Sequence, residues 1–286
     1  RVFCPAGDLN EEVAVLIKTG EKYLKEGVLP HMWCSGCGIG VMLGALLRSF
    51  EDLGYSRNET VLVTGIGCTG KADDYLVTNA LHTTHGRALA FATGIKAFKP
   101  ELKVVAIMGD GDGVTIGGNH FIHAARRNID ITAIVNNNFN YGMTGGQASG
   151  TTPGGKLSST TLYGNPESDF DVSALACAAG ANYVARTTIA HGWEMSQHIR
   201  EALTKKGFSL VEVISPCPTN YGKRNKMGEP VDMLRLLKQN CVTAEEYERM
   251  SEAEKEESFI IGKLCDRDNP DFNTRYNEIQ ARAMNS

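Results

Sequence analysis

The sequence has 286 residues, of which 42% are hydrophobic and 22% charged, a composition that suits one large globular α/β domain or two small ones. Its formal net charge is −4 and it contains no block of Lys and Arg, so the electrostatic signature of nucleic-acid or anionic-membrane binding is missing. No apolar run reaches about eighteen residues, which excludes a transmembrane helix. The N-terminus lacks the pattern of a signal peptide, and we therefore expect a cytoplasmic protein.

Five predicted strands follow one another along the chain. Each is a continuous apolar run rather than an alternating one, which is typical of strands buried on both faces of a parallel sheet. They are "TVLVTGIG" from Thr60, "LKVVAIMGDG" from Leu102, "IDITAIVNNN" from Ile129, "NYVARTT" from Asn182 and "SLVEVISPC" from Ser209. Helical patterns occupy 38–53, 86–98, 118–128, 171–179 and 192–205. This alternation predicts a doubly wound, mainly parallel α/β sheet, which binds ligands at the carboxyl ends of its strands.

The chain divides into three predicted parts: an N-terminal segment over 1–32, the α/β domain over 33–221 and a C-terminal extension over 222–286. Within the domain, 139–167 is rich in Gly, Ser and Thr, and so long a loop is usually a functional lid or disordered. The extension contains "MLRLLKQN" and "TAEEYERMSEAEKEESFIIGKLC", which have the pattern of short, charged amphipathic helices. We expect it to have no core of its own.

A glycine-rich turn that carries two acids follows the second predicted strand, in "MGDGDGVTIGG". Backbone N–H groups in such a turn can approach a phosphate, but the carboxylates of Asp110 and Asp112 would repel one. A cation between them resolves the conflict, and Mg²⁺ fits because it takes oxygen ligands. A second source of oxygen, Asn138 in "NNNFNYGMTGG", lies 28 residues later, at the end of the next strand. Parallel neighbouring strands would bring both residues to one edge.

This pattern of Gly-Asp-Gly followed by an Asn pair resembles the thiamine diphosphate motif, and with it the diphosphate-binding domain of thiamine enzymes. The resemblance implies that Asp110 and Asn138 bind Mg²⁺ by their side chains and Asn140 by its backbone carbonyl. A merely structural turn is the alternative. The residues expected to contact the cofactor are Ile66, Gly67, Cys68, Gly109, Asp110, Gly111, Asp112, Asn138, Tyr141, Gly142, Met143 and Thr144.

The segment "GIGCTG" from Gly65 gives a competing signal, because it matches the G-x-G-x-x-G dinucleotide fingerprint after a predicted strand. That fingerprint needs an acid about 20 residues further on to bind the ribose. No Asp or Glu occurs between Tyr75 and Pro100, and the motif contains a cysteine. An NAD site is therefore disfavoured.

Four of the eight cysteines have positions that suit a metal centre. Cys34 and Cys37 form a Cys-x-x-Cys pair in "WCSGCG", Cys68 follows the first predicted strand and Cys217 follows the last. Four thiolates suit either zinc or an iron–sulfur cluster, and the position beside the cofactor edge favours iron–sulfur. We expect Cys177 to be a core residue. The remaining cysteines, which we expect to be unliganded, are Cys4, Cys241 and Cys265.

Together, "WCSGCG", "GIGCTGK", "HTTHGRALAFATGIK", "GDGDGVTIGGNHFIHAARRNIDIT", "NNNFNYGMTGGQASGTTP" and "SPCPTN" resemble the β subunit of 2-oxoacid:ferredoxin oxidoreductases. The resemblance spans about two-thirds of the chain and is greatest to the 2-oxoglutarate type. It implies a [4Fe–4S] cluster on Cys34, Cys37, Cys68 and Cys217, beside thiamine diphosphate and Mg²⁺. Many relatives have Pro in place of Ser35, which should not affect cluster binding.

The resemblance also implies an α subunit, usually in a dimer of αβ pairs, with the C-terminal extension packing on the partner. The implied reaction is the decarboxylation of 2-oxoglutarate to succinyl-CoA and CO₂ with coenzyme A and ferredoxin, or its reverse. We expect the catalytic glutamate of such enzymes to come from the partner chain. Candidate catalytic residues here are Lys71, for the substrate carboxylate, and His85 and Arg87.

Three rival interpretations remain at this point. The same chemistry could act on pyruvate or a branched 2-oxoacid. A non-redox thiamine diphosphate decarboxylase with a structural zinc would use the same motifs without electron transfer. A non-catalytic scaffold subunit would keep the fold without the reaction.

Overall fold

The computed structural model describes residues 20–255 and 258–285. Its strands are β1 (Thr60–Thr64), β2 (Asn79–His82), β3 (Lys103–Gly109), β4 (Thr132–Asn137), β5 (Tyr183–Thr188), β6 (Ser209–Ile214), β7 (Cys241–Val242), β8 (Phe259–Ile260) and β9 (Gly262–Asp266). Its α-helices are α2 (Ile39–Asp52), α3 (Ala88–Phe98), α4 (Gly118–Arg126), α5 (Val172–Ala179), α6 (Gly192–Thr204), α7 (Pro230–Asn240), α8 (Ala244–Glu248), α9 (Glu252–Lys255) and α10 (Phe272–Met284). Short helical turns are η1 (Glu21–Tyr23), η2 (Thr69–Tyr75), η3 (Gly111–Ile116) and η4 (Pro218–Gly222).

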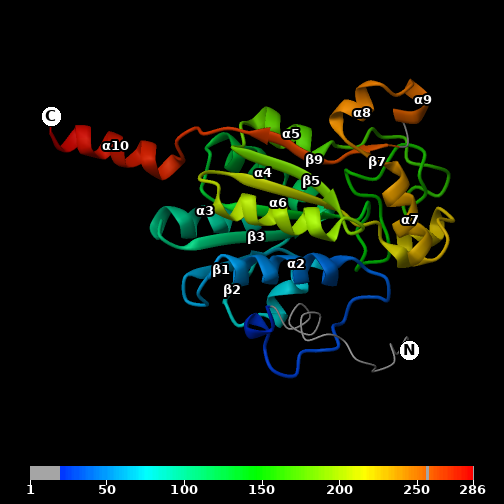
Figure 1. Ribbon diagram of the computed structural model, residues 1–286, viewed down its shortest axis with the longest axis horizontal. Helices are drawn as coiled ribbons and strands as arrows, with labels where there is room; N and C mark the ends of the chain where they lie inside the picture. Colours follow the sequence, from blue (N-terminus) through cyan, green and yellow to red (C-terminus); the bar gives the residue numbers. More distant parts are fainter. Residues whose placement is uncertain (1–19, 256–257, 286) are drawn as a thin grey trace.

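The main sheet has seven strands in the order β2-β1-β3-β4-β6-β5-β9. All neighbouring pairs are parallel except β5 and β9, which are antiparallel. The predicted doubly wound, mainly parallel sheet is therefore confirmed, and all five predicted strands and five predicted helices are present. Figure 1 shows the helices arranged on both sides of this sheet.

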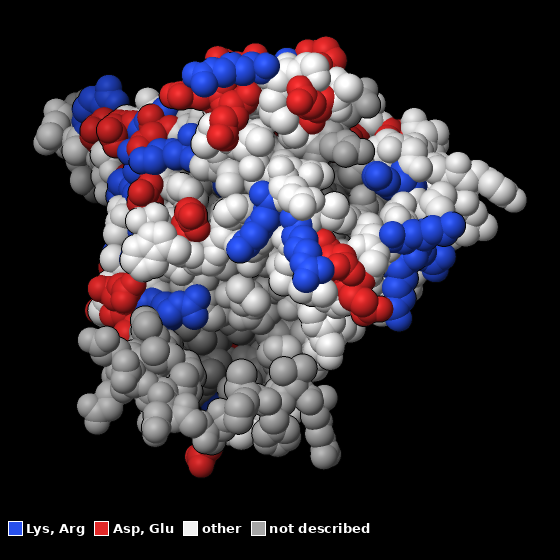
Figure 2. Space-filling model, turned by 45° about the vertical axis from the view of Figure 1, so that its right-hand side comes forward, with Lys and Arg blue, Asp and Glu red and all other residues white. Residues whose placement is uncertain are grey.

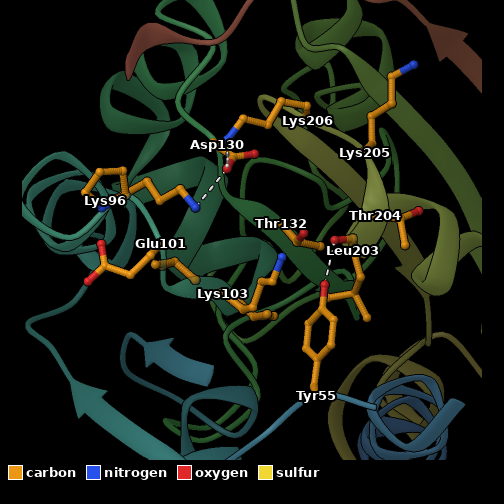
Figure 3. A pocket seen from close by; sticks show the side chains of 13 residues that line it. Tyr55, Lys96, Glu101, Lys103, Asp130, Thr132, Leu203, Thr204, Lys205 and Lys206 are labelled. Atoms are coloured by element: carbon orange, nitrogen blue, oxygen red, sulfur yellow. Dashed lines mark hydrogen bonds and ion pairs between the residues drawn. The ribbon is translucent and has the colours of Figure 1, made fainter. Parts of the chain in front are cut away.

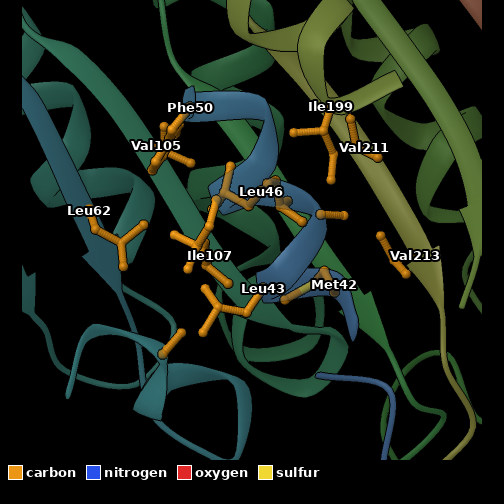
Figure 4. Packing of buried hydrophobic residues seen from close by; sticks show 14 of the residues in the cluster. Met42, Leu43, Leu46, Phe50, Leu62, Val105, Ile107, Ile199, Val211 and Val213 are labelled. Carbon is orange, nitrogen blue, oxygen red and sulfur yellow. The ribbon is translucent and has the colours of Figure 1, made fainter. Parts of the chain in front are cut away.

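Two apolar layers hold the helices against the sheet, because alternate residues of each strand point to opposite faces. On one face, α2 and α6 cover side chains such as Leu62, Ile107 and Val211. Figure 4 shows Leu43, Leu46 and Phe50 of α2 lying over these strands. On the other face, α3, α4 and α5 cover the alternate residues of the same strands. The strands are consequently buried on both sides, as their continuous apolar runs require.

The C-terminal extension differs from the sequence prediction. The helix expected from "MLRLLKQN" is present as α7, but the region expected to be helical up to Cys265 contains only two short helices, α8 and α9. It then forms β8 and β9, and β9 adds an antiparallel edge to the main sheet. Antiparallel edge pairing with β5 thus outweighs the weak helical pattern. In Figure 1 the last helix, α10, projects from one end of the molecule.

Candidate functional site

Four strands that are neighbours in the sheet, β1, β3, β4 and β6, deliver the candidate residues at their carboxyl ends. A cavity of about 80 Å³ lies at this edge. All twelve residues expected to contact the cofactor line it, together with Thr69, His85 and Asn140. The topology thus brings together sequence segments that are separated by up to 78 residues.

Asp110 is the most deeply buried acid of this cavity and is fully enclosed. Its Oδ2 accepts hydrogen bonds from Ser149 Oγ at 2.5 Å and Thr151 Oγ1 at 2.7 Å, and its Oδ1 accepts one from the Asn138 N–H at 3.2 Å. Burial raises the pKa of Asp110, although hydrogen bonds from Ser149 and Thr151 oppose the rise. A cation beside this carboxylate would favour its charged form.

Asp112 joins two loops that precede and follow β2. Its Oδ1 accepts hydrogen bonds from the Gly86 N–H at 2.7 Å and the Ile66 N–H at 3.2 Å, and lies 2.6 Å from Nδ1 of His85. Its Oδ2 is buried and has no hydrogen-bond partner. Gly65 is required here, because a Cβ at this position would lie 1.9 Å from Asp112 Oδ2. Asp112 therefore holds the glycine-rich turn that contains it against the loops at Ile66 and Gly86.

The Asn pair after β4 is shaped by Phe139, whose φ of 63° is unusual for a residue other than glycine. This turn allows the Asn140 N–H to donate to Asn138 Oδ1 at 3.2 Å. Asn140 Oδ1 and Thr69 Oγ1 are buried polar atoms without a partner. Unpaired buried oxygens next to a buried carboxylate are the donor set that a hydrated Mg²⁺ and a diphosphate would satisfy. The residues that line this cavity therefore fit both Mg²⁺ and a diphosphate.

The thiols of Cys37 and Cys68 lie close enough to those of Cys34 and Cys217 to feel their charge. Burial raises the pKa of the Cys37 thiol and of the Cys68 thiol to about 11, and the neighbouring thiols contribute to each rise. Among residues 20–255 and 258–285, no three His, Cys, Asp or Glu side chains are grouped to hold a single metal ion.

The thiol group and the cavity are in direct contact. A Cβ added to Gly142 would lie 3.6 Å from Cys68 Sγ, and Cys68 itself lines the cavity. Asn220 donates its backbone N–H to Cys217 Sγ at 3.4 Å and its side-chain amide to the Gly142 carbonyl at 2.9 Å. The indole of Trp33 donates to the Cys68 carbonyl at 2.7 Å and attaches the Cys-x-x-Cys segment to the same edge.

The other predicted site residues have different positions. His85 lines the cavity, but Lys71 and Arg87 do not. The Lys71 amine forms an ion pair with Asp74, and Arg87 is exposed at the start of α3. Their roles in the reaction stay predictions.

The cysteines outside the thiol group have the following positions. Cys177 packs against the core and is half-buried, as are Cys241 and Cys265, while Cys4 lies outside the described residues. None of the described helices is long and apolar enough to cross a membrane.

A larger cavity of about 260 Å³ lies at the opposite edge of the sheet, beside Lys103 and Thr132 at the starts of β3 and β4 (Figure 3). Lys96 and Lys206 both bind Asp130 there, each at 2.8 Å. Burial opposes ionisation of Asp130, but hydrogen bonds from these lysines outweigh it and hold its pKa below the ordinary value. None of the predicted site residues lines this cavity, and ligands of open α/β sheets bind at the other edge.

Comparison with known proteins agrees with this geometry. Residues 65–213 match the family "Thiamine pyrophosphate enzyme, C-terminal TPP binding domain". The chain is 47% identical to 2-oxoglutarate synthase subunit KorB of Methanocaldococcus jannaschii, over 88% of this chain and 93% of that protein. It is 54% identical to the same subunit of Archaeoglobus fulgidus, over 76% of this chain and 79% of that protein. The chain belongs to the β-subunit family of 2-oxoglutarate:ferredoxin oxidoreductases.

A solved structure is also similar to this β subunit. It is 2-oxoglutarate:ferredoxin oxidoreductase from Magnetococcus marinus with 2-oxoglutarate, coenzyme A and succinyl-CoA bound, with a TM-score of 0.82 and 29% sequence identity. The match covers 93% of the β subunit and 91% of that chain. The thiamine pyrophosphate family match includes Cys68, Asp110 and Asn138 but ends before Cys217. The thiol group therefore extends beyond the part shared with thiamine enzymes in general.

Three residues of the β-subunit site were missed by sequence reasoning. Ser149 and Thr151 hold Asp110, and Thr69 lines the cavity. Thr69 directly follows Cys68 and could have been found from that position. Ser149 and Thr151 lie among many other Ser and Thr residues of 139–167, and no spacing distinguishes them.

Proposed function

We propose that this β subunit, with its α subunit, converts 2-oxoglutarate and coenzyme A to succinyl-CoA and CO₂, or runs the reverse reaction, and passes electrons to ferredoxin. Thiamine diphosphate with Mg²⁺ and a [4Fe–4S] cluster would be its resident cofactors. The observation that carries the proposal is the contact between the diphosphate-type cavity and the four-thiol group through Cys68 and Gly142. Electrons released at thiamine diphosphate could reach the cluster only if the two cofactors lie close together.

The chain's own residues would bind the diphosphate end of the cofactor. Asp110 and Asn138 would hold Mg²⁺ by their side chains and Asn140 by its carbonyl, while the backbone around Gly111 approaches the phosphates. Gly111 allows this approach because a Cβ there would lie 2.4 Å from the Tyr141 ring. When bound, thiamine diphosphate supplies an electron sink for decarboxylation of a 2-oxoacid.

The position of the thiol group supports an iron–sulfur cluster. Four thiolates suit either zinc or an iron–sulfur cluster. A redox centre in contact with the cofactor cavity through Cys68 would have a use in the reaction, whereas a zinc ion there would not. The backbone N–H of Asn220 donates a hydrogen bond to Cys217 Sγ. Such a hydrogen bond to a ligand sulfur would tune the reduction potential of a bound cluster.

A partner subunit would complete the active site. No glutamate lines the cavity within the described residues, so the acid that activates the cofactor would come from the α subunit. The loop after β4 carries exposed apolar side chains, among them Met143, Leu162 and Tyr163, and they suit burial against another chain. Part of the C-terminal extension would contribute to that contact.

The test is an assay of the anaerobically purified αβ complex. Coenzyme A-dependent reduction of methyl viologen is measured with 2-oxoglutarate, pyruvate and a branched 2-oxoacid in parallel, and iron and acid-labile sulfide are determined. We expect the highest kcat/KM with 2-oxoglutarate and about four irons per β subunit. One zinc without sulfide, or 2-oxoacid turnover that needs no acceptor, would contradict the proposal.

A further inference from the structure

The chain segment that follows Cys217 is rich in positive charge, although the whole chain has a net charge of −4. Residues 217–240 contain five Lys and Arg against two Asp and Glu. Three of the basic residues, Lys223, Arg224 and Lys226, come within nine positions of Cys217. The reaction at the cofactor edge gives these cations no role, and none of them lines the cofactor cavity.

Local structure fixes these cations next to the thiol group. Cys217 is the N-cap of η4 and Lys223 is its C-cap, and the Gly222 N–H donates to the Cys217 carbonyl at 2.8 Å. A single helical turn therefore separates the Cys217 sulfur from the first cation, a distance on the order of 10 Å. The basic side chains begin where the cluster-binding segment meets the surface.

A fourth cation comes from the long loop after β4. Asn225 accepts a hydrogen bond from the Leu157 N–H at 2.8 Å and donates one to the Leu157 carbonyl at 3.0 Å, which fixes 156–157 beside 225–226. Lys156 and Lys226 line one surface depression of about 320 Å³. We define the basic patch as Lys156, Lys223, Arg224 and Lys226.

The charges of the basic patch are not neutralised by the chain. All four side chains are exposed, and none forms an ion pair with a residue of 20–255 or 258–285. Other lysines of the same chain behave differently: Lys22 pairs with Glu51 and Lys205 with Asp266. Figure 2, which brings the α7 side forward, shows several basic side chains in the right-hand part of the face, with acidic side chains beside them. Such a patch attracts a negatively charged partner over a range of about 8–10 Å.

We propose that the basic patch is the docking surface for a small acidic electron-carrier protein, which approaches the cluster over Cys217. This inference rests on the proposed function. Each encounter would pass one electron from a cluster bound at the thiol group to the carrier, and no atom would be transferred. Oxidation of one 2-oxoacid with coenzyme A releases CO₂, one proton and two electrons, so two oxidised carriers are reduced per turnover.

The test compares two double charge reversals in the assembled αβ complex. K223E/R224E changes the basic patch, and K99E/R127E is the matched control, because Lys99 and Arg127 are one exposed Lys and one exposed Arg at the opposite edge of the sheet. Each complex is assayed with an acidic ferredoxin and with methyl viologen as acceptor, between low and high salt. Methyl viologen needs no docking surface, so the viologen assay measures only catalysis and electron transfer through the cluster.

We expect K223E/R224E to lower kcat/KM for ferredoxin roughly 100-fold at low salt. In the wild type kcat/KM for ferredoxin should fall as salt rises, and in the variant this dependence should be lost. Viologen reduction should be unchanged. The control should retain wild-type behaviour. The inference is overturned if both variants lose ferredoxin activity equally, or if neither does. It is also overturned if K223E/R224E raises KM for coenzyme A in the viologen assay, or if the variant loses its α subunit on purification. A wild-type complex that fails to reduce viologen overturns the proposed function, and the docking inference with it.

Discussion

A buried charged network below the Asn pair gives a sharp test of how the sheet edge is held. Glu212 of β6 accepts hydrogen bonds from Arg186 Nε at 2.8 Å, from Ser173 Oγ at 2.6 Å and from Asn137 Nδ2 at 2.9 Å. Only 2% of Glu212 and 7% of Arg186 are exposed. Asn137 directly precedes the predicted Mg²⁺ ligand Asn138. The network therefore connects the packing of β4, β5 and β6 to the loop that contains this predicted ligand.

We expect Arg186→Met to destabilise the protein by about 3–5 kcal/mol, because it leaves the Glu212 carboxylate buried without its counter-ion. For a chain of this size the midpoint of thermal unfolding should fall by roughly 10 °C. Glu212→Gln should lower the free energy of unfolding by less, about 1–3 kcal/mol, because Arg186 keeps its ion pair with Asp171. The double variant should be more stable than Arg186→Met alone, since the unpaired buried charge is gone.

The measurement is thermal unfolding of the four proteins at one concentration and one cofactor level. Arg200→Met is the matched control, because Arg200 forms an exposed ion pair with Asp52 at 2.8 Å. Removing that pair should cost less than about 1 kcal/mol. Equal losses for Arg186→Met and Arg200→Met, or a double variant no more stable than Arg186→Met, would refute the reasoning.

Three further changes have definite expected outcomes. Asp110→Asn should abolish Mg²⁺-dependent thiamine diphosphate binding in calorimetry without lowering apo stability, because burial already opposes the charge there; normal binding would exclude Asp110 as a ligand. Cys217→Ser should remove the visible iron–sulfur absorption and viologen reduction while Mg²⁺-dependent cofactor binding persists, and an unchanged spectrum would exclude Cys217. Burial lowers the pKa of His198 below 6.5, so the unfolded chain binds more protons than the folded one just below that pH. Stability should therefore fall as pH drops through this range, and His198→Gln should reduce that slope in urea titrations at pH 5 to 7.

The sequence predicted the parts of this site that depend on short-range pattern. Asp110 and Asn138 each end an apolar strand, and parallel neighbours must deliver both to one edge. The same argument located Cys68 and Cys217, which end two further strands. Their positions follow from strand order alone, and no side-chain detail is needed.

Other features depend on long-range pairing and could not be predicted from local pattern. The short edge strand β2 is exposed along its length, and β9 has a mixed pattern that gives no clear period. The pairing of Arg186 with Glu212 needs the β5–β6 register, in which these two residues are direct partners. Glu212 within the apolar run "SLVEVISPC" was the available signal, because a carboxylate there must find a partner.

Asn220 connects the two halves of the site physically. Its backbone N–H lies against the Cys217 sulfur and its side chain holds the Gly142 carbonyl of the cofactor loop. A group bound to the thiols would hold Cys217 and hence Asn220, which in turn would hold the loop at Gly142. A cofactor in the cavity would hold the same loop from the other side, so we expect the second group to bind to lose less conformational entropy than the first. Since such coupling is reciprocal, we expect each centre to raise the affinity for the other by the same factor.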